Sequence, residues 1–203
     1  MSTETETSQY HHGDLAAALV RAALELLEGG GTPDLSLRAV ARRAGVAPSA
    51  PYRHYADRDA LLSAVAAVGY GDLAGALAAA HPAPATPDDL AAVAVAYVEF
   101  ALRRPALFRV MFGEPCDRDT AERVAATKAI AAYVSGIVER AFPGSEPEAL
   151  STGIWALVHG LAFLYLDGKL DASDLDAAAS RVRASVHAVL NAPASMTSSN
   201  ARA

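Results

Sequence analysis

The chain has 203 residues, 52% of them apolar, which is enough for one large core or for a small domain joined to a larger one. Its single cysteine, Cys116, excludes an intramolecular disulfide, and without a CxxC pair or a Cys/His cluster there is no zinc framework of the usual spacing. The net charge of −6 argues at first against a nucleic-acid partner. However, residues 36–58 hold five arginines against one acid, a charge of +4, which leaves −10 for the other residues. A basic module on an acidic body could still bind a polyanion.

Neither end of the chain has the composition of a folded segment. Residues 1–9 are rich in Ser, Thr and Glu and lack the basic start and apolar run of a signal peptide, so we expect a disordered tail and a cytoplasmic protein. Residues 193–203 are expected to be a second disordered tail. The longest apolar stretch, Ile154–Leu166, is shorter than the roughly 20 residues that cross a bilayer. We therefore expect a buried helix and no membrane partner.

Helical periodicity begins close to the N-terminus. Apolar residues recur at helical spacing between Asp14, a possible cap, and the glycines 29–31: Leu15, Leu19, Ala22, Leu26 and Leu27. Ser36 can cap a second helix, with Leu35 and Val40 forming a hydrophobic staple across its first turn. Gly45 ends this helix in a left-handed conformation, so a third short helix over residues 47–55 must cross the second.

The rest of the sequence predicts longer helices and no strands. Asp57 can cap a fourth helix that carries Leu61, Leu62, Val65 and Val68, and the prolines of residues 81–87 mark a connection. Further helices are predicted at 88–103, 105–112, 118–142, 147–166 and 172–191. The prediction is an all-α fold of about nine helices.

Residues 35–62, LSLRAVARRAGVAPSAPYRHYADRDALL, contain the most informative motif. A glycine turn separates a nine-residue helix from a short one that ends in aromatic and basic residues, which is the spacing of a helix-turn-helix. The turn 44–46, the block Tyr52-Arg53-His54-Tyr55 and the start of the next helix at 57–59 resemble the signature of the TetR family. The resemblance implies a three-helix DNA-binding domain over 10–56 and a ligand-binding and dimerisation domain over 57–192.

The resemblance also implies roles for individual residues in binding double-stranded DNA. Positions that look toward base edges are occupied by Ala47, Pro48, Ser49 and Ala50, with Arg53 one turn later. Positions similar to those that contact phosphates hold Tyr52, His54 and Arg58, and positions that touch the backbone from the other side hold Ser36 and Arg38. Because base-edge donors are sparse, Ser49 and Arg53 are the best candidates for reading sequence. For Tyr55 we favour a core aromatic that faces the first helix.

Two departures from the family pattern leave an alternative open. Pro51 stands where the family usually has an aliphatic residue and removes an early helical hydrogen bond, so the first turn of the recognition helix could be tight or irregular. Ala47 replaces the usual Ser or Thr cap. The alternative is a helical ligand-binding or protein-interaction module without operator binding.

The stretch Ile154–Gly168 is apolar on every side, so as a helix it needs two different partners. One face consists of Gly153, Ala156 and Gly160, and another stacks Trp155, His159 and Phe163. The Trp155, His159 and Gly160 pattern resembles the TetR C-terminal class named after its Trp-His-Gly signature. It implies a homodimer in which the last two helices of each subunit form a four-helix bundle. The last helix would contribute a stripe that includes Leu175, Val182 and Val186, of which part could equally be intramolecular core.

A small-molecule effector site is expected in the C-terminal domain. Its candidate lining residues are aromatic or soft and could equally be core: Tyr97, Phe100, Phe108, Met111, Phe112, Tyr133, Trp155 and His159. Neighbours in sequence point apart, so we do not interpret His11 and His12 as a metal site, and no cofactor or metal is expected.

Catalytic motifs are missing from the sequence, which has no glycine-rich phosphate loop, GxSxG elbow or paired His/Glu spacing. The function that the sequence predicts is therefore not enzymatic. It is a transcription regulator that binds a palindromic operator, with release of a repressor by its effector as the family-level expectation.

Overall fold

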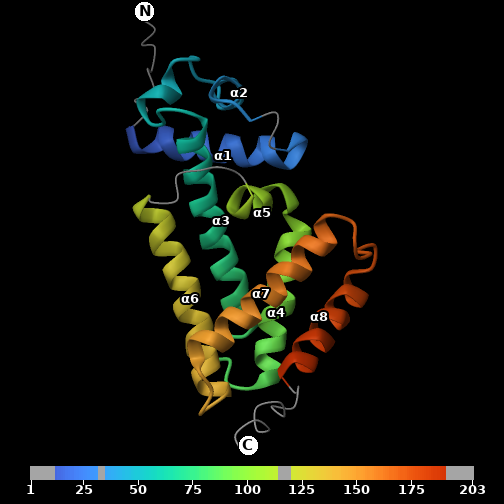
Figure 1. The fold of residues 1–203 in the computed structure, drawn as a ribbon. Helices are drawn as coiled ribbons and strands as arrows, with labels where there is room; N and C mark the ends of the chain where they lie inside the picture. The colour runs from blue at the N-terminus through green and yellow to red at the C-terminus, as the bar shows by residue number, and fades with distance from the viewer. Residues whose placement is uncertain (1–11, 32–34, 114–119, 191–203) are drawn as a thin grey trace, which may run out of the picture. The chain divides into compact units, whose positions relative to one another are not determined.

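The computed structural model describes residues 12–31, 35–113 and 120–190, and over these ranges it is all-helical, without a strand (Figure 1). The elements are α1 His12–Gly30, α2 Leu37–Arg43, the 3-10 helix η2 Ala50–Arg53, α3 Arg58–Ala80, α4 Pro87–Arg103, α5 Pro105–Phe112, α6 Ala121–Ala141, α7 Pro147–Leu166 and α8 Leu175–Leu190. The all-α prediction is confirmed, and the described ranges hold eight α-helices and one 3-10 helix where the sequence predicted about nine helices. The terminal segments predicted to be disordered lie outside the described residues.

Contacts along the chain define two compact units. The first consists of Met1–Tyr70 and Ala106–Ala125, and the second of Gly71–Pro105 and Ala126–Ala203. Helices α3 and α6 contribute to both units, and α5 groups with the N-terminal helices except for its first residue. This grouping differs from a division of the chain at residue 57, because the first half of α3 packs with the N-terminal helices.

The first unit is built on the apolar side of α1. Leu19 and Leu27 of α1 are buried, as are Leu37 and Val40 of α2. The hydroxyl of Tyr55 donates a long hydrogen bond of 3.4 Å to the carbonyl of Ala16. Its partial burial raises the pKa of the phenol. Tyr55 thus faces the first helix, as predicted.

Two predicted helix starts differ in the structure. Helix α1 already includes His12, so Asp14 lies inside the helix and does not precede it as a cap. The third predicted helix, 47–55, is reduced to the four residues of η2. By contrast, Asp57 caps α3 as predicted, since its Oδ1 accepts a hydrogen bond of 2.8 Å from the amide of Ala60.

A close approach between α3 and α5 completes the first unit. A Cβ on Gly69 would lie 2.7 Å from Sδ of Met111, so only glycine leaves room for this contact. The Met111 carbonyl accepts two hydrogen bonds, from the Tyr70 hydroxyl at 2.9 Å and from Nη2 of Arg123 at 3.0 Å. The guanidinium of Arg123 also lies over the Tyr70 ring, 5.6 Å from its centroid. A buried arginine therefore helps to hold the end of α5.

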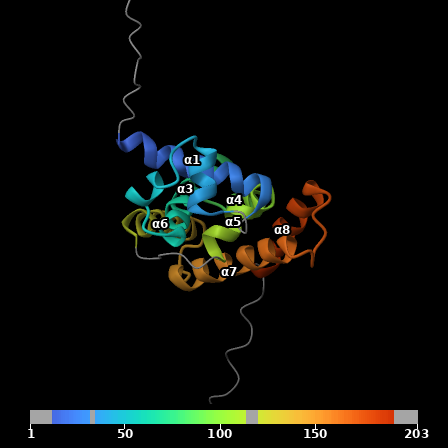
Figure 2. The same ribbon diagram turned by 90° about the horizontal axis from the view of Figure 1, so that it is seen from above.

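In the second unit, α4 packs against α7 and α8 (Figures 1 and 2). Helix α4 is buried over most of its length, and α7 contributes Ile154, Val158, Leu161, Ala162 and Tyr165 to the same core. From α8, the buried residues are Ala178, Val182 and Val186. The core of this unit thus brings α4 together with two consecutive helices from much later in the chain.

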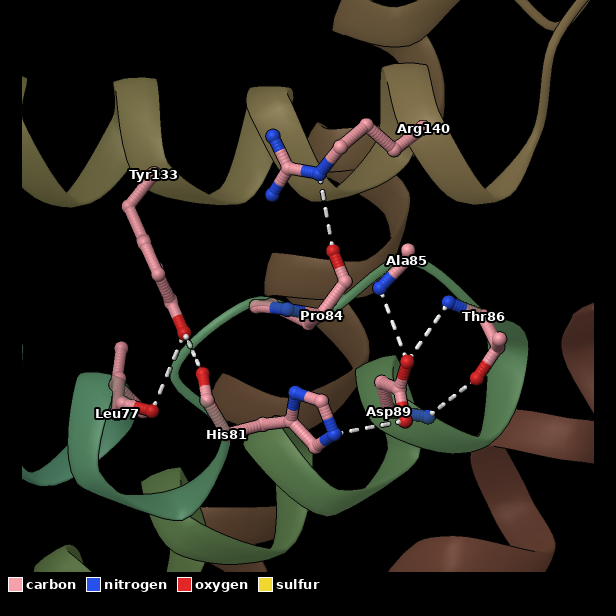
Figure 3. Close-up of polar contacts among 8 residues, drawn as sticks. All are labelled: Leu77, His81, Pro84, Ala85, Thr86, Asp89, Tyr133 and Arg140. Atoms are coloured by element: carbon pink, nitrogen blue, oxygen red, sulfur yellow. Dashed lines mark hydrogen bonds and ion pairs between the residues drawn. The ribbon is translucent and has the colours of Figure 1, made fainter.

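The connection between α3 and α4 is held by polar contacts (Figure 3). Thr86 and Asp89 form a capping box at the start of α4, and the Asp89 carboxylate accepts hydrogen bonds from the amides of Ala85 and Thr86. The first of these bonds, from Ala85, is the main reason that the pKa of Asp89 is lowered. Helix α6 holds the other side, where Arg140 Nε donates to the Pro84 carbonyl at 3.0 Å. The proline-rich segment is therefore an ordered connection.

Candidate functional site

The first helix of the motif is set by its own sequence. Ser36 Oγ accepts a hydrogen bond of 3.1 Å from the amide of Ala39, and Leu35 and Val40 are both buried on either side of this cap. Gly45 has a φ of 70°, and its amide donates to the Arg42 carbonyl. The predicted cap and left-handed turn are confirmed, and both residues of the predicted staple are buried.

The recognition segment follows this turn and is shorter than predicted. The amide of Ala50 donates to the Ala47 carbonyl at 2.9 Å, and the amides of His54 and Tyr55 both donate to the Pro51 carbonyl at 2.9 Å. Pro51 has no amide hydrogen to continue an α-helical ladder, so the segment forms a 3-10 turn around it. The tight first turn that Pro51 predicted is therefore found.

Side chains on this segment divide clearly between outside and inside. Ala47, Pro48, Ser49 and Arg53 are exposed, and Tyr52 is 54% exposed, whereas Pro51 is buried. Ala50 is half-buried. The residues expected to face base edges are thus mostly on the surface, and the buried Pro51 anchors the segment to the unit beneath it.

Two of the side chains expected to contact phosphates are half-buried. Arg58 is half-buried, and its Nε donates a hydrogen bond of 3.0 Å to the Leu35 carbonyl. His54 is also half-buried, and its Nε2 is buried without a hydrogen-bond partner among the described residues. Arg58 is therefore held by a contact within the motif, and the Ser36 hydroxyl is used as the cap of α2, whereas Tyr52 and Arg38 are exposed.

The basic surface of the motif includes arginines that the residue-by-residue resemblance did not assign. Arg42 and Arg43 follow Arg38 on α2, and all three are exposed. Arg43 Nε pairs with a Glu25 carboxylate oxygen of α1 at 2.6 Å. Because that pair is largely exposed, it contributes little to stability. Arg42 could have been found from the sequence by its spacing of four from Arg38.

In the second unit, His159 is the centre of an aromatic cluster. Its Nδ1 shares a hydrogen bond of 2.9 Å with the hydroxyl of Tyr97, which is buried on α4. The ring of Trp155 lies 5.7 Å from the His159 ring, and the ring of Phe163 lies 4.9 Å from it. Burial lowers the pKa of His159, so the imidazole is neutral near pH 7. Sequence alone could not link Tyr97 to His159, which are 62 residues apart.

The eight residues expected to line an effector site do not all belong to one unit. Tyr97, Phe100, Tyr133, Trp155 and His159 belong to the second unit, and Phe108, Met111 and Phe112 to the first. Phe108 and Met111 are fully buried. The hydroxyl of Tyr133 donates to the carbonyls of Leu77 and His81, both at 3.2 Å (Figure 3). Burial raises the pKa of Tyr133. Phe108 and Met111 are thus core residues of the first unit, and Tyr133 is hydrogen-bonded within the second, while an effector site stays a prediction.

One side of α7 is apolar and exposed. Gly153, Ala156 and Gly160 lie on it, together with Leu164, which is 43% exposed, and Trp155 at its edge is 51% exposed. A Cβ added at Gly153 or Gly160 would meet no atom within 4 Å. No helix of the described chain therefore approaches this face. Helix α7 was predicted to need two packing partners, and within the described chain it is covered on one side only.

On α8, the residues predicted for a dimer interface are split. Leu175 is 41% exposed, but Val182 and Val186 are fully buried in the subunit core. Both valines therefore pack within the second unit, which is the intramolecular alternative for this stripe, and contact with a partner subunit stays a prediction for Leu175. Periodicity identified the apolar stripe but not which helix covers it.

By length and composition, two helices could cross a membrane. They are α3, whose most apolar window is 50% buried, and α7, whose most apolar window is 28% buried. Helix α7 is longer than the apolar stretch Ile154–Leu166, since it begins at Pro147. Such helices are weak evidence for a membrane span, because core helices of soluble proteins have the same length and composition.

Within the residues that the structure describes, no group of three metal-ligating side chains is found.

A capped helix, a left-handed glycine and an exposed basic segment define a helix-turn-helix protein with an additional helical unit. The family described as bacterial regulatory proteins of the tetR family matches residues 19–65, and the family described as the tetracyclin repressor-like C-terminal domain matches residues 90–189. The chain therefore belongs to the TetR family of bacterial regulatory proteins.

Individual relatives agree with this assignment. An HTH-type transcriptional regulator of Mycobacterium tuberculosis strain H37Rv is 35% identical over 104 residues, which is 50% of this chain and 44% of the relative. The chain thus matches less than half the length of this curated relative. A solved structure of a protein of unknown function from Rhodococcus sp. RHA1 is 33% identical, with a TM-score of 0.73, and the match covers 88% of this chain and 96% of that one. A tetR-family regulatory protein from Rhodococcus RHA1 shares the fold at 24% identity, with a TM-score of 0.64 over 89% of this chain and 96% of that one.

Proposed function

We propose that the protein is a sequence-specific DNA-binding transcription regulator that reads a palindromic operator as a homodimer. The observation that carries the proposal is the largely exposed recognition segment 47–53, which follows the capped α2 and its exposed arginines Arg38 and Arg42. A segment of this kind fits a major groove, with phosphate contacts from the arginines of α2.

The proposed dimer uses the exposed apolar side of α7. An unpaired apolar face of this kind marks an interaction surface in a soluble protein. The glycines at 153 and 160 would allow a helix of a second copy to approach closely, and Leu175 and Val189 extend the exposed apolar surface along α8. Covering α7 in this way also accounts for its composition without a membrane.

We further propose that an apolar or aromatic small molecule binds in the second unit and lowers operator affinity, which makes the protein a repressor. The aromatic residues Tyr97, Phe100, Trp155 and His159 support this. Trp155, His159 and Gly160 also support a C-terminal domain of the Trp-His-Gly type. An effector can act only through its different affinities for the two conformations of the dimer. A regulator of this kind would act in the cytoplasm and would not be an enzyme.

Selection of bound sequences from a random DNA pool tests operator binding directly. The purified protein should enrich near-palindromic sites whose half-sites are about 34 to 36 Å apart, or one helical turn. Failure to enrich any sequence would favour the alternative of a ligand-binding or protein-interaction module without an operator, which Pro51 first suggested. A compound screen then tests regulation, because effectors should raise the melting temperature and weaken operator binding together.

A further inference from the structure

The exposed start of the recognition segment lacks the side chains that read bases through paired hydrogen bonds. Arginine reads guanine, and asparagine or glutamine reads adenine, by two parallel hydrogen bonds. Ala47 and Pro48 have no side-chain donor or acceptor, and Ser49 has one hydroxyl. All three are exposed. This part of the segment can therefore discriminate between bases mainly by apolar contact.

One base-pair feature in the major groove fits such a contact, namely the 5-methyl group of thymine. We propose that Pro48, with Ala47 beside it, is a specificity-determining residue that recognises thymine through this methyl group. The inference rests on the proposed function, since it requires the recognition segment to lie in a major groove of the operator.

The local structure holds Pro48 in place for this role. The hydrogen bond from the Ala50 amide to the Ala47 carbonyl closes a tight turn around Pro48, and a proline ring adds no rotamers to be fixed on binding. On the other side of the turn, Pro51 is buried and anchors the segment. One proline thus faces the protein interior and the other faces outward as a rigid apolar surface.

The first test changes only the DNA. In the selected operator, each thymine of both half-sites is replaced in turn by deoxyuracil, which removes the methyl group and keeps every hydrogen-bonding atom. At the position read by Pro48, burial of one methyl group is worth about 0.8 kcal/mol, or about fourfold in Kd. With both half-sites changed, we expect a loss of about 16-fold.

A reciprocal change separates methyl recognition from DNA shape. Replacing the same T·A pair by C·G should weaken binding, and replacing it by 5-methylcytosine·G should recover about fourfold per half-site relative to C·G, because the methyl group returns while the pair stays wrong. A loss with C·G that 5-methylcytosine does not reduce would overturn the inference in favour of shape or water-mediated reading.

The second test pairs these DNAs with protein variants. P48A should bind the thymine and deoxyuracil operators equally at that position, with an unchanged salt dependence, because no charge is removed. P82A, which alters an exposed proline between α3 and α4, is the matched control and should keep the full thymine preference. Thermal unfolding of both variants confirms that they fold.

Each remaining outcome decides the inference. If the protein enriches an operator but deoxyuracil has no effect at any position, operator binding stands and methyl recognition is wrong. If P48A keeps the thymine preference and S49A loses it, Ser49 is the reader and not Pro48. If no DNA sequence is enriched, the proposed function fails, and the inference fails with it.

Discussion

Nε of Arg58 donates a hydrogen bond of 3.0 Å to the backbone carbonyl of Leu35, which joins the first residue of α3 to the residue before the cap of α2. The two are 23 positions apart, and the bond is partly buried. Arg58 therefore holds the helix-turn-helix against the longer helix that follows it. By contrast, Arg38 lies exposed on α2.

These two arginines should respond differently to removal. Because a hydrogen bond from a charged donor contributes about 1.5 to 3 kcal/mol, R58A should lower the free energy of unfolding by roughly that amount and weaken binding to all DNA sequences alike. R38A should leave stability unchanged and lower the salt dependence of DNA binding by about one counterion per subunit. Urea unfolding and a salt titration of the binding constant measure both. Equal stability of the two variants would contradict a structural role for Arg58 and favour a contact with phosphate.

Two serines of the motif form a second matched pair. S36A removes the side chain that caps α2 and should cost about 1 kcal/mol of stability. Ser49 precedes η2 without a capping hydrogen bond, so S49A should change stability by less than about 0.5 kcal/mol. Urea denaturation of both variants is the measurement. A similar cost for both would mean that Ser49 also has a structural role.

Association through α7 is tested by a glycine substitution. G160E places a carboxylate on the exposed apolar side of α7, where an added Cβ meets nothing within the subunit, so the monomer should fold normally. At a dimer interface the same carboxylate would be buried without a partner and should shift the protein to monomer. G71E is the control, because Gly71 of α3 is equally free of neighbours within 4 Å. Light scattering that finds G160E still dimeric at low concentration would contradict the proposed interface.

His159 should make stability depend on pH in a specific direction. Burial lowers the pKa of His159 in the folded protein below its ordinary value of 6.5, so the unfolded chain binds the proton more readily. The stability that the neutral imidazole provides is complete above about pH 6.5 and is lost as the pH falls below that value toward the folded pKa. H159Q removes this titration, so its Tm should fall less than that of the wild type between pH 7.5 and 5.5. Parallel Tm curves for the two proteins would show that His159 does not contribute.

Much of the DNA-binding motif is determined by local sequence. The Ser36 cap, the apolar pair Leu35 and Val40, and the left-handed Gly45 depend on residues within a few positions of one another, so their chemistry can be read directly from the sequence. Pro51 likewise predicted a tight turn, because a missing amide hydrogen acts at its own position. What the sequence did not predict here is that the turn would shorten the third helix to a 3-10 helix.

Only the tertiary structure decided which side of each apolar helix is covered. Periodicity predicted one apolar stripe on α8, yet Val182 and Val186 are buried while Leu175 stays exposed, because the packing of α4 and α7 in the second unit selects among them. The sequence also did not predict the hydrogen bonds from Arg58 to Leu35 and between Tyr97 and His159. Their partners are 23 and 62 residues apart, and local propensity has no information at that distance.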